Sequence, residues 1–523
     1  MVRAGARMPQ AGRAFACCLA ALFALGEPVS AQTERNAELA DAARAGDLKA
    51  VEALLATDAS IAIDAEGTDG TPALHWLVRG EHTTLVDAVL HAGANPNQPS
   101  RYGILPVDLA AANGSGQLIR VLTAAGADPN SRNQLGETVL MTATESGSEG
   151  AVTALLDAGA DVQARDSTFQ QTALMIAARR GDENVAALLI RAGTDVDAAT
   201  RVGDEPEWIL PNSRPGFSFG VGIIRGGLPE DRGMRPFRRG GMTALHFAAR
   251  EGHAQLAAQL LDAGAAIDPR EANDITPLLM AISNGRMAVA RVLIERGAQI
   301  DTTDWYGRSP LWSAVNVRNI YLHNETFDHT ADRDSALGII ELLLERGADP
   351  NPRTRESPPV REHLLSITGT LEWVDFTGQT PFIAAARAGD TTSMRRLLEH
   401  GADPHIETFA GTTALMAAAG VNWVVSQTYT EGAESLLEAV KLCHELGLDV
   451  NASNSMGITA VHGAANRGSN AIIEFLVEQG AQLDAADNEG RTPLDWARGV
   501  FLATHPAEPK PESIALLESL GAS

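Results

Sequence analysis

A period of 33 residues constrains the fold of this chain more than any other feature of its sequence. A short opening close to Gly-x-Thr-Pro-Leu-His starts each period. An Ala-Ala pair, a glycine turn, a leucine-rich stretch and a Gly-Ala-Asp-x-Asn ending follow it. The opening glycine is found at Gly70, Gly103, Gly136, Gly241, Gly307, Gly378, Gly411, Gly457 and Gly490, with Asp274 in its place once. A fixed period of this size, in which turn residues divide each unit into two helices, predicts a stacked-repeat solenoid.

The unit from Gly241 to Asn273 shows how one period builds itself. Gly241 supplies a turn that needs a positive φ, Thr243 is placed to cap the first helix, and Gly252 is placed to end it. The second helix carries apolar residues at helical spacing, which we expect to be buried against the next unit: Leu256, Ala257, Leu260 and Leu261.

Three stretches carry a family resemblance. Thr-Ala-Leu-His-Phe-Ala-Ala-Arg-Glu-Gly-His at 243–253, Gly-Ala-Asp-Pro-Asn at 347–351 and Asn-Glu-Gly-Arg-Thr-Pro-Leu-Asp-Trp-Ala at 488–497 resemble the ankyrin-repeat consensus. The resemblance implies an all-α solenoid in which each unit has two antiparallel helices and a projecting hairpin or loop. Twelve units begin near residues 34, 70, 103, 136, 170, 241, 274, 307, 378, 411, 457 and 490.

The resemblance also assigns a role to three histidines. His75, His246 and His462 match the motif histidine of the family, which implies that each braces neighbouring turns by hydrogen bonding. Because these histidines lie in separate repeats, they cannot all coordinate one metal ion. We expect the protein to bind no metal or cofactor.

The first 31 residues have the pattern of a secretory signal peptide. Three arginines precede an apolar run from Ala14 to Leu25, and Val29-Ser30-Ala31 offers small residues for cleavage before Gln32. The apolar run is too short to span a membrane. The Ala/Arg/Gly-rich sequence and short signal favour a bacterial source, so we expect a periplasmic or secreted protein.

Removal of residues 1–31 leaves Cys443 as the single cysteine, so the mature chain forms no internal disulfide. Cys443 takes the place of a leucine in a helical run, and we expect a buried, inert side chain. The formal charge of the whole chain is −25. A field of this sign repels phosphate backbones, which argues against a nucleic-acid partner.

Four insertions interrupt the period and divide the chain. Repeats 1–5 occupy residues 32–199, and repeats 6–12 occupy 241–523. The segments 200–240 and 353–377 interrupt the hairpin position, whereas 318–334 and 421–434 separate the two helices of a repeat. In the family's geometry these two kinds of insertion rise on opposite rims of the inner-helix surface.

The insertions hold ten of the 22 aromatic residues that follow residue 31. Aromatic side chains supply much of the contact energy at binding sites, and they also anchor long loops. Both roles stay open. We take Trp208, Trp373, Trp423 and Tyr429 as candidate partner-binding residues, together with the inner helices of repeats six to eleven.

Two further patterns in the insertions each have a structural and a functional interpretation. Five arginines within 225–239 either pair with the array's own carboxylates or hold an acidic neighbour. Gly216-Phe217-Ser218-Phe219-Gly220 fits the nucleophile elbow of serine hydrolases, but its prolines and glycines deny the strand and helix that the elbow needs.

These observations predict a monomeric, non-catalytic, exported scaffold that binds a protein partner. The alternative function is a small-molecule or glycan receptor whose pocket is walled by the insertions. A third is an enzyme hosted by the insertions.

Overall fold

The structure of the protein is a computed structural model that describes residues 29–57, 62–203, 239–320, 330–355, 377–422, 430–499 and 508–522. Within these ranges all regular elements are helices, 24 of them, which form twelve consecutive pairs. Three isolated β-bridges occur at the turns between repeats. The all-α prediction with twelve helix-turn-helix units is therefore confirmed.

The chain divides into two compact units. The first contains α1 (Val29–Ala45), α2 (Leu48–Thr57), α3 (Ala73–Arg79), α4 (Thr83–His91), α5 (Pro106–Ala112), α6 (Gly116–Ala124), α7 (Val139–Ser146) and α8 (Glu149–Asp157). Helix α10 (Glu183–Arg191) is shared between the units, since residues 187–194 group with the first and residues 169–186 with the second.

The second unit contains the remaining helices. They are α9 (Ala173–Arg180), α11 (Ala244–Glu251), α12 (Ala254–Asp262), α13 (Pro277–Ser283), α14 (Met287–Glu295), α15 (Pro310–Ile320), α16 (Thr330–Glu345), α17 (Pro381–Ala388), α18 (Thr391–Glu399), α19 (Ala414–Ala419), α20 (Ala433–Glu445), α21 (Ala460–Arg467), α22 (Asn470–Glu478), α23 (Pro493–Arg498) and α24 (Pro511–Ser519).

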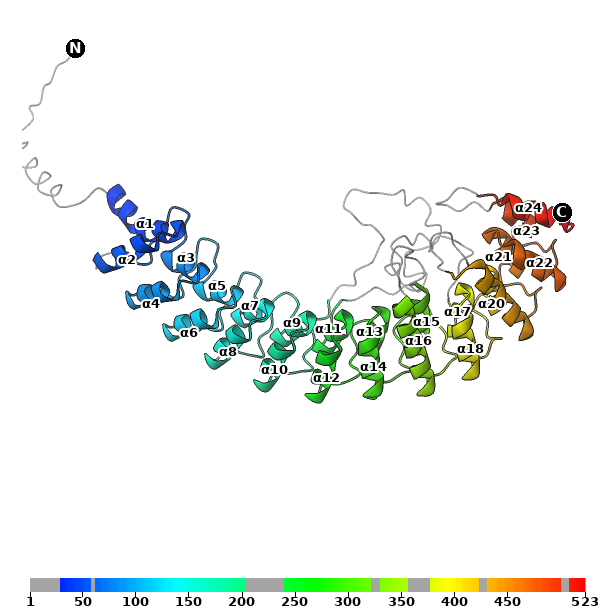
Figure 1. The fold of residues 1–523 in the computed structure, drawn as a ribbon, viewed down its shortest axis with the longest axis horizontal. Coiled ribbons are helices and arrows are strands. Elements are labelled where there is room, and N and C mark those ends of the chain that lie inside the picture. The colour runs from blue at the N-terminus through cyan, green and yellow to red at the C-terminus, as the bar shows by residue number, and fades with distance from the viewer. Residues whose placement is uncertain are drawn as a thin grey trace, which may run out of the picture. The chain divides into compact units, whose positions relative to one another are not determined.

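Each unit has two layers of helices. In the second unit the odd-numbered helices from α9 to α23 pack each against the next, and the even-numbered helices from α12 to α24 do the same (Figure 1). The first unit repeats this arrangement with α1 to α7 and α2 to α8. The apolar core lies between the layers and continues from one repeat to the next, as expected for a solenoid.

Helices α11 and α12 test the expected details of one repeat. Gly252 ends α11 at φ 96°, and its N–H donates to the carbonyl of Ala248. Thr243 is the N-cap residue, as expected, although its hydroxyl lies 3.1 Å from Nδ1 of His246. Leu256 and Leu260 are fully buried, but Leu261 is half-buried because it is rotated by about 100° around α12 from Leu260. The expected burial of Leu261 against the next unit is therefore only partial.

A short tip turn, of five residues in most cases, joins successive repeats. In the turn from Glu271 to Ile275, the N–H of Glu271 donates to the carbonyl of Ile275, and the N–H of Asp274 donates back to the carbonyl of Glu271. The Glu271 carboxylate accepts the N–H of Ile275 at 3.2 Å. The fourth position is left-handed, with φ 76° at Gly241 and φ 62° at Asp274, which explains why glycine recurs there.

The two hairpin insertions leave this turn intact. Thr200 donates to the carbonyl of Met242 at 3.0 Å, and Gly241 donates back to Thr200 at 3.0 Å. Thr354 makes the same pair of bonds with Gln379 and Gly378, at 3.0 and 2.8 Å. The inserted residues therefore enter between the second and third positions of an otherwise ordinary tip turn.

The helices around the other two insertions extend further than the sequence predicts. Helix α15 continues to Ile320 and α16 begins at Thr330, so both enter the segment 318–334, and α20 begins within 421–434. The extension has a local cause. Arg318 donates to the carbonyl of Arg333 at 2.7 Å, and Arg333 donates to the carbonyl of Arg318 at 3.3 Å, which ties the end of α15 to the start of α16.

Candidate functional site

The four aromatic residues predicted to bind a partner lie outside the residues that the structure describes. Trp208, Trp373, Trp423 and Tyr429 all fall in the undescribed stretches of the insertions, as does the Gly-x-Ser-x-Gly motif at Ser218. Their assignment stays a prediction.

The inner helices of repeats six to eleven present few exposed side chains. All six residues of α19 are buried, and in α17 only Arg387 is not fully buried. At the central position of these helices Phe247, Ala384 and Ala417 are each 5% exposed or less. Among the described residues, the exposed apolar side chains that could contact a partner lie on other elements.

The tip turns carry the exposed apolar side chains of the described structure. Of its seven exposed large hydrophobic residues, six belong to tip turns or to the bases of the insertions within them: Tyr102, Ile104, Leu135, Phe169, Val202 and Phe409. Tyr102, Leu135, Phe169 and Phe409 are each about 60% exposed (61, 63, 60 and 59%). Single exposed apolar residues are ordinary, but here they are concentrated on one kind of element, the tip turn, which makes the tip turns the candidate interaction surface.

Hydrogen bonds fix the tip turns of the first unit to one another. Gln134 donates to the carbonyl of Tyr102 at 2.9 Å, and Ser167 donates to the carbonyl of Leu135 at 2.8 Å. The Arg101 guanidinium lies 5.0 Å from the centre of the Tyr102 ring and donates to the carbonyl of Asp69. The apolar side chains therefore project from a braced backbone.

The second unit has a related arrangement at the tip turns that open repeats eight to ten. Trp305 and Tyr306 stack with ring centres 5.6 Å apart. The Arg353 guanidinium lies 4.3 Å from the centre of the Phe409 ring. Backbone bonds link the turns, from Arg355 to the Tyr306 carbonyl at 2.7 Å and from Phe409 to the Thr377 carbonyl at 3.1 Å.

The motif histidines brace the tip turns from below. The Nε2 atoms of His75, His246 and His462 lie 2.9, 3.0 and 3.1 Å from the carbonyls of Ile104, Ile275 and Arg491 in the next tip turn. Burial lowers the pKa of all three imidazoles, and the hydrogen bond to the carbonyl only partly opposes this. The predicted bracing role is confirmed.

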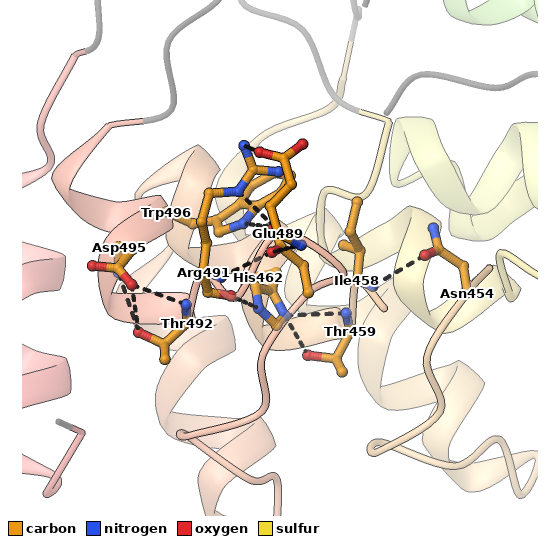
Figure 2. Close-up of polar contacts among 10 residues, drawn as sticks. Asn454, Ile458, Thr459, His462, Glu489, Arg491, Thr492, Asp495 and Trp496 are labelled. Carbon is orange, nitrogen blue, oxygen red and sulfur yellow. Dashed lines mark hydrogen bonds and ion pairs between the residues drawn. The ribbon is translucent and has the colours of Figure 1, made fainter. Parts of the chain in front are cut away.

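Figure 2 shows the most developed of these braces, between repeats eleven and twelve. His462 packs edge-on to Trp496 with ring centres 5.8 Å apart, and the Trp496 indole donates to Asp487 at 2.9 Å. Arg491 pairs with Asp487 at 2.7 Å. Burial alone raises the pKa of the Asp487 carboxyl, but hydrogen bonds from Arg491 and Trp496 outweigh it and hold the pKa below its ordinary value. The His462 contacts join repeat eleven to repeat twelve, and the two Asp487 contacts close the tip turn of repeat twelve and hold it against its first helix.

The bases of the two inter-helix insertions are joined at the opposite end of the helices. Arg318 and Asp390 form a buried ion pair with Nε and Oδ2 3.0 Å apart. Arg333, at the end of one insertion, pairs with Glu431, at the end of the other. Glu431 also donates its N–H to the carbonyl of Ala388 at 2.8 Å. The two insertions therefore start from one common base across repeat nine.

The remaining possibilities are a reactive cysteine, a metal site and a membrane-spanning helix. Cys443 is fully buried in α20, and burial raises the pKa of its thiol to about 12, which confirms the prediction of a buried cysteine and makes the thiolate inaccessible at neutral pH. Within the described ranges no group of three His, Cys, Asp or Glu side chains has a metal-binding arrangement. None of the described helices has the length and apolarity needed to cross a membrane.

The sequence carried a signal for the tip surface that the repeat pattern alone did not reveal. The residue directly before the opening glycine is large and apolar at Tyr102, Leu135, Tyr306 and Met456. These residues lie in the turns between helices, so the helical spacing of apolar residues does not reveal them. Tyr102 and Leu135 at this position are exposed, but Tyr306 is buried. The exposed Phe409 lies one position earlier, so a scan of this position would have found only part of the surface.

Comparison with known proteins agrees with this architecture. A family model described as "Ankyrin repeats (3 copies)" matches residues 107–200, 229–304, 245–354 and 425–499, and one described as "Ankyrin repeat" matches 377–409. The human ankyrin repeat and SOCS box protein 16 is 29% identical over 207 residues, which are 36% of this chain and 44% of the relative. The chain thus spans less than half the length of that relative.

Two solved structures are also similar. The ankyrin repeat domain of Bcl-3, titled a unique member of the IkappaB protein family, shares 24% identity at a TM-score of 0.38, over 49% of this chain and 97% of that one. The human ASB11 ankyrin repeat domain shares 19% identity at a TM-score of 0.37, over 53% of this chain and 98% of that one.

Proposed function

The chain belongs to the ankyrin-repeat family, and from this premise we propose that it is an exported, non-catalytic scaffold that binds a protein partner through its tip turns. Ankyrin-repeat domains generally mediate protein–protein interaction. The observation that carries the proposal is that six of the seven exposed large apolar residues of the described structure lie on the tip turns or at the bases of the insertions within them. Exposed aromatic residues in a braced setting suit binding, because little side-chain and backbone freedom is lost when a partner docks.

The insertions extend the proposed surface. Trp208, Trp373, Trp423 and Tyr429 are proposed to contact the partner beside the tip turns. Replacing Trp373 or Trp423 by alanine is expected to weaken binding roughly thirtyfold if each is a central anchor, without a change in melting temperature. If both variants bind normally, the insertions take no part. If both unfold, the aromatics anchor the loops instead.

Export is the second part of the proposal and rests on the sequence of residues 1–31. Protein recovered from its native host is expected to begin at Gln32, in the periplasm of a bacterium or outside the cell. N-terminal sequencing of that protein tests the point, and an intact Met1 on the purified chain would refute it.

Site-directed photo-crosslinking in the native host tests the binding surface. A crosslinker at position 135 is expected to capture a defined protein, and the capture should be lost when Tyr102 and a second tip residue of the same unit, Ile104, are changed to serine. Leu520→Ser is the matched control, because Leu520 is 38% exposed but lies at the end of α24, away from any tip turn. Equal capture by the tip variant and the control would overturn the proposal.

A further inference from the structure

We propose that the tip turns opening repeats eight to ten bind a negatively charged peptide segment that carries an apolar side chain. The arginine–aromatic surface consists of Trp305, Arg353, Arg355 and Phe409, and the buried Tyr306 ring stacks on Trp305. The inference rests on the proposed function, since it names the chemistry of the partner that the scaffold takes.

The first argument is the pre-organisation of the arginine–aromatic surface. Arg353 is held over the Phe409 ring by bonds from its guanidinium to the carbonyls of Gly378 and Glu407. The linked backbones of the three turns set the spacing between Tyr306, Arg355 and Phe409. Phe409 is 59% exposed even with Arg353 stacked on it, so most of its ring is available to an apolar side chain of a partner.

The second argument is charge. The chain carries a net charge of −25, yet among the described residues of these three turns the exposed ions are Arg353 and Arg355 against the carboxylate of Glu407. Asp304 does not alter this balance, because its carboxylate is buried in a 2.7 Å pair with Arg308.

These two features select the class of ligand. Guanidinium groups bind carboxylates in a planar, two-pronged geometry. Arg353 already donates from Nε and Nη2 to the carbonyls of Gly378 and Glu407. Arg355 is therefore the residue proposed to bind a carboxylate in this way. Arginine and aromatic residues are also the residue types enriched at binding hot spots. An acidic segment with one apolar side chain can pair with the arginines and can also pack on the exposed Phe409 ring. A long polyanion is disfavoured, because the rest of the acidic array repels it.

Fluorescence anisotropy with labelled synthetic peptides tests the inference on the full chain. The probe is a dodecapeptide of aspartate and glycine with two phenylalanines, and the counter-probe replaces each aspartate by lysine. The acidic probe is expected to bind at least about tenfold more tightly than the lysine probe, and its affinity should fall as NaCl is raised.

Variants locate the site. Arg355→Gln and Phe409→Ser are each expected to lower the affinity for the acidic probe by about tenfold or more. Arg395→Gln is the matched control, because Arg395 is exposed on α18 of repeat nine but lies away from the tip turn, so its removal changes the net charge equally. Unchanged melting temperatures show that each variant is folded.

Three results would overturn the inference: equal binding of the lysine probe, an equal loss in Arg395→Gln, or tighter binding of an oligothymidylate than of the acidic peptide. These results are distinguishable from failure of the proposed function. A partner captured at position 135 would leave the scaffold proposal standing even if the acidic probe bound nowhere.

Discussion

The motif histidines show how one residue joins two repeats. His246 is fully buried, its Nδ1 faces Thr243 and its Nε2 faces the carbonyl of Ile275 in the next tip turn. Burial lowers the pKa of His246 from 6.5 to about 4, and the bond to Ile275 only partly opposes the shift. The imidazole is therefore neutral in the folded chain at any pH above that value.

The stability of the array should consequently depend on pH. Because the folded pKa is below the unfolded value, the unfolded chain binds more protons between pH 6.5 and pH 4, and the stabilising effect present above pH 6.5 is lost as the pH falls through this window. The shift corresponds to roughly 3 kcal/mol. Chemical denaturation at several pH values should show a flatter profile for His246→Gln than for the wild type. Parallel profiles would contradict this account.

At the scale of the element, α12 shows how burial is decided within one helix. Leu260 is fully buried and Leu261 is half-buried, although they are neighbours in the chain. Helical geometry rotates adjacent residues by about 100°, so only one of the two faces the core. The pair therefore offers an internal control for the cost of an inter-repeat cavity.

Leu260→Ala should destabilise the protein by roughly 2–5 kcal/mol, the range for a leucine whose removal leaves a cavity. Leu261→Ala should cost clearly less, because a half-buried side chain loses less apolar contact. Denaturant midpoints of the two variants measure the difference. A larger loss for Leu261→Ala would show that the register of α12 is wrong.

The tip turn is a second element with a sharp consequence. Residues 356–376 enter between Arg355 and Thr377, whose backbone bonds to Tyr306 and Phe409 are those of an ordinary turn. Joining Arg355 directly to Thr377 should therefore restore a five-residue turn and leave the neighbouring helices intact. Loop-closure entropy then favours the shorter chain by about 0.6 kcal/mol for each halving of length. Circular dichroism and thermal melting test this. Loss of helical signal would mean that the insertion is needed for folding.

At the scale of the whole molecule, charge is the dominant feature. A net charge of −25 is spread over an array whose repeats contact only their neighbours, so repulsion acts along the chain without a central core to offset it. The described ion pairs are mostly exposed, as with Arg296–Asp262 and Lys441–Glu438, and contribute little.

Moderate salt should therefore stabilise the array. Raising NaCl screens the repulsion between carboxylates over distances beyond the Debye length, whereas the buried pair Arg318–Asp390 is screened much less. The melting temperature is expected to rise between low and physiological ionic strength. A fall in melting temperature over that range would show that ion pairs outweigh the net charge.

The sequence by itself determined the repeat, the helix pairs and the histidine braces. Each of these is set by interactions within about one period, such as the left-handed glycine of the tip turn and the apolar spacing of the second helix. The burial of Cys443 was predictable for the same reason, because it replaces a leucine in that spacing.

Only the tertiary structure decided the tip surface and the common base of the inter-helix insertions. Tyr306, Arg355 and Phe409 become neighbours because stacking brings together turns that are separated by at least one whole repeat. Arg333 and Glu431 meet although 98 residues separate them. No local periodicity encodes such pairs, since their contact depends on how successive repeats stack and on chain lengths that vary between the helices.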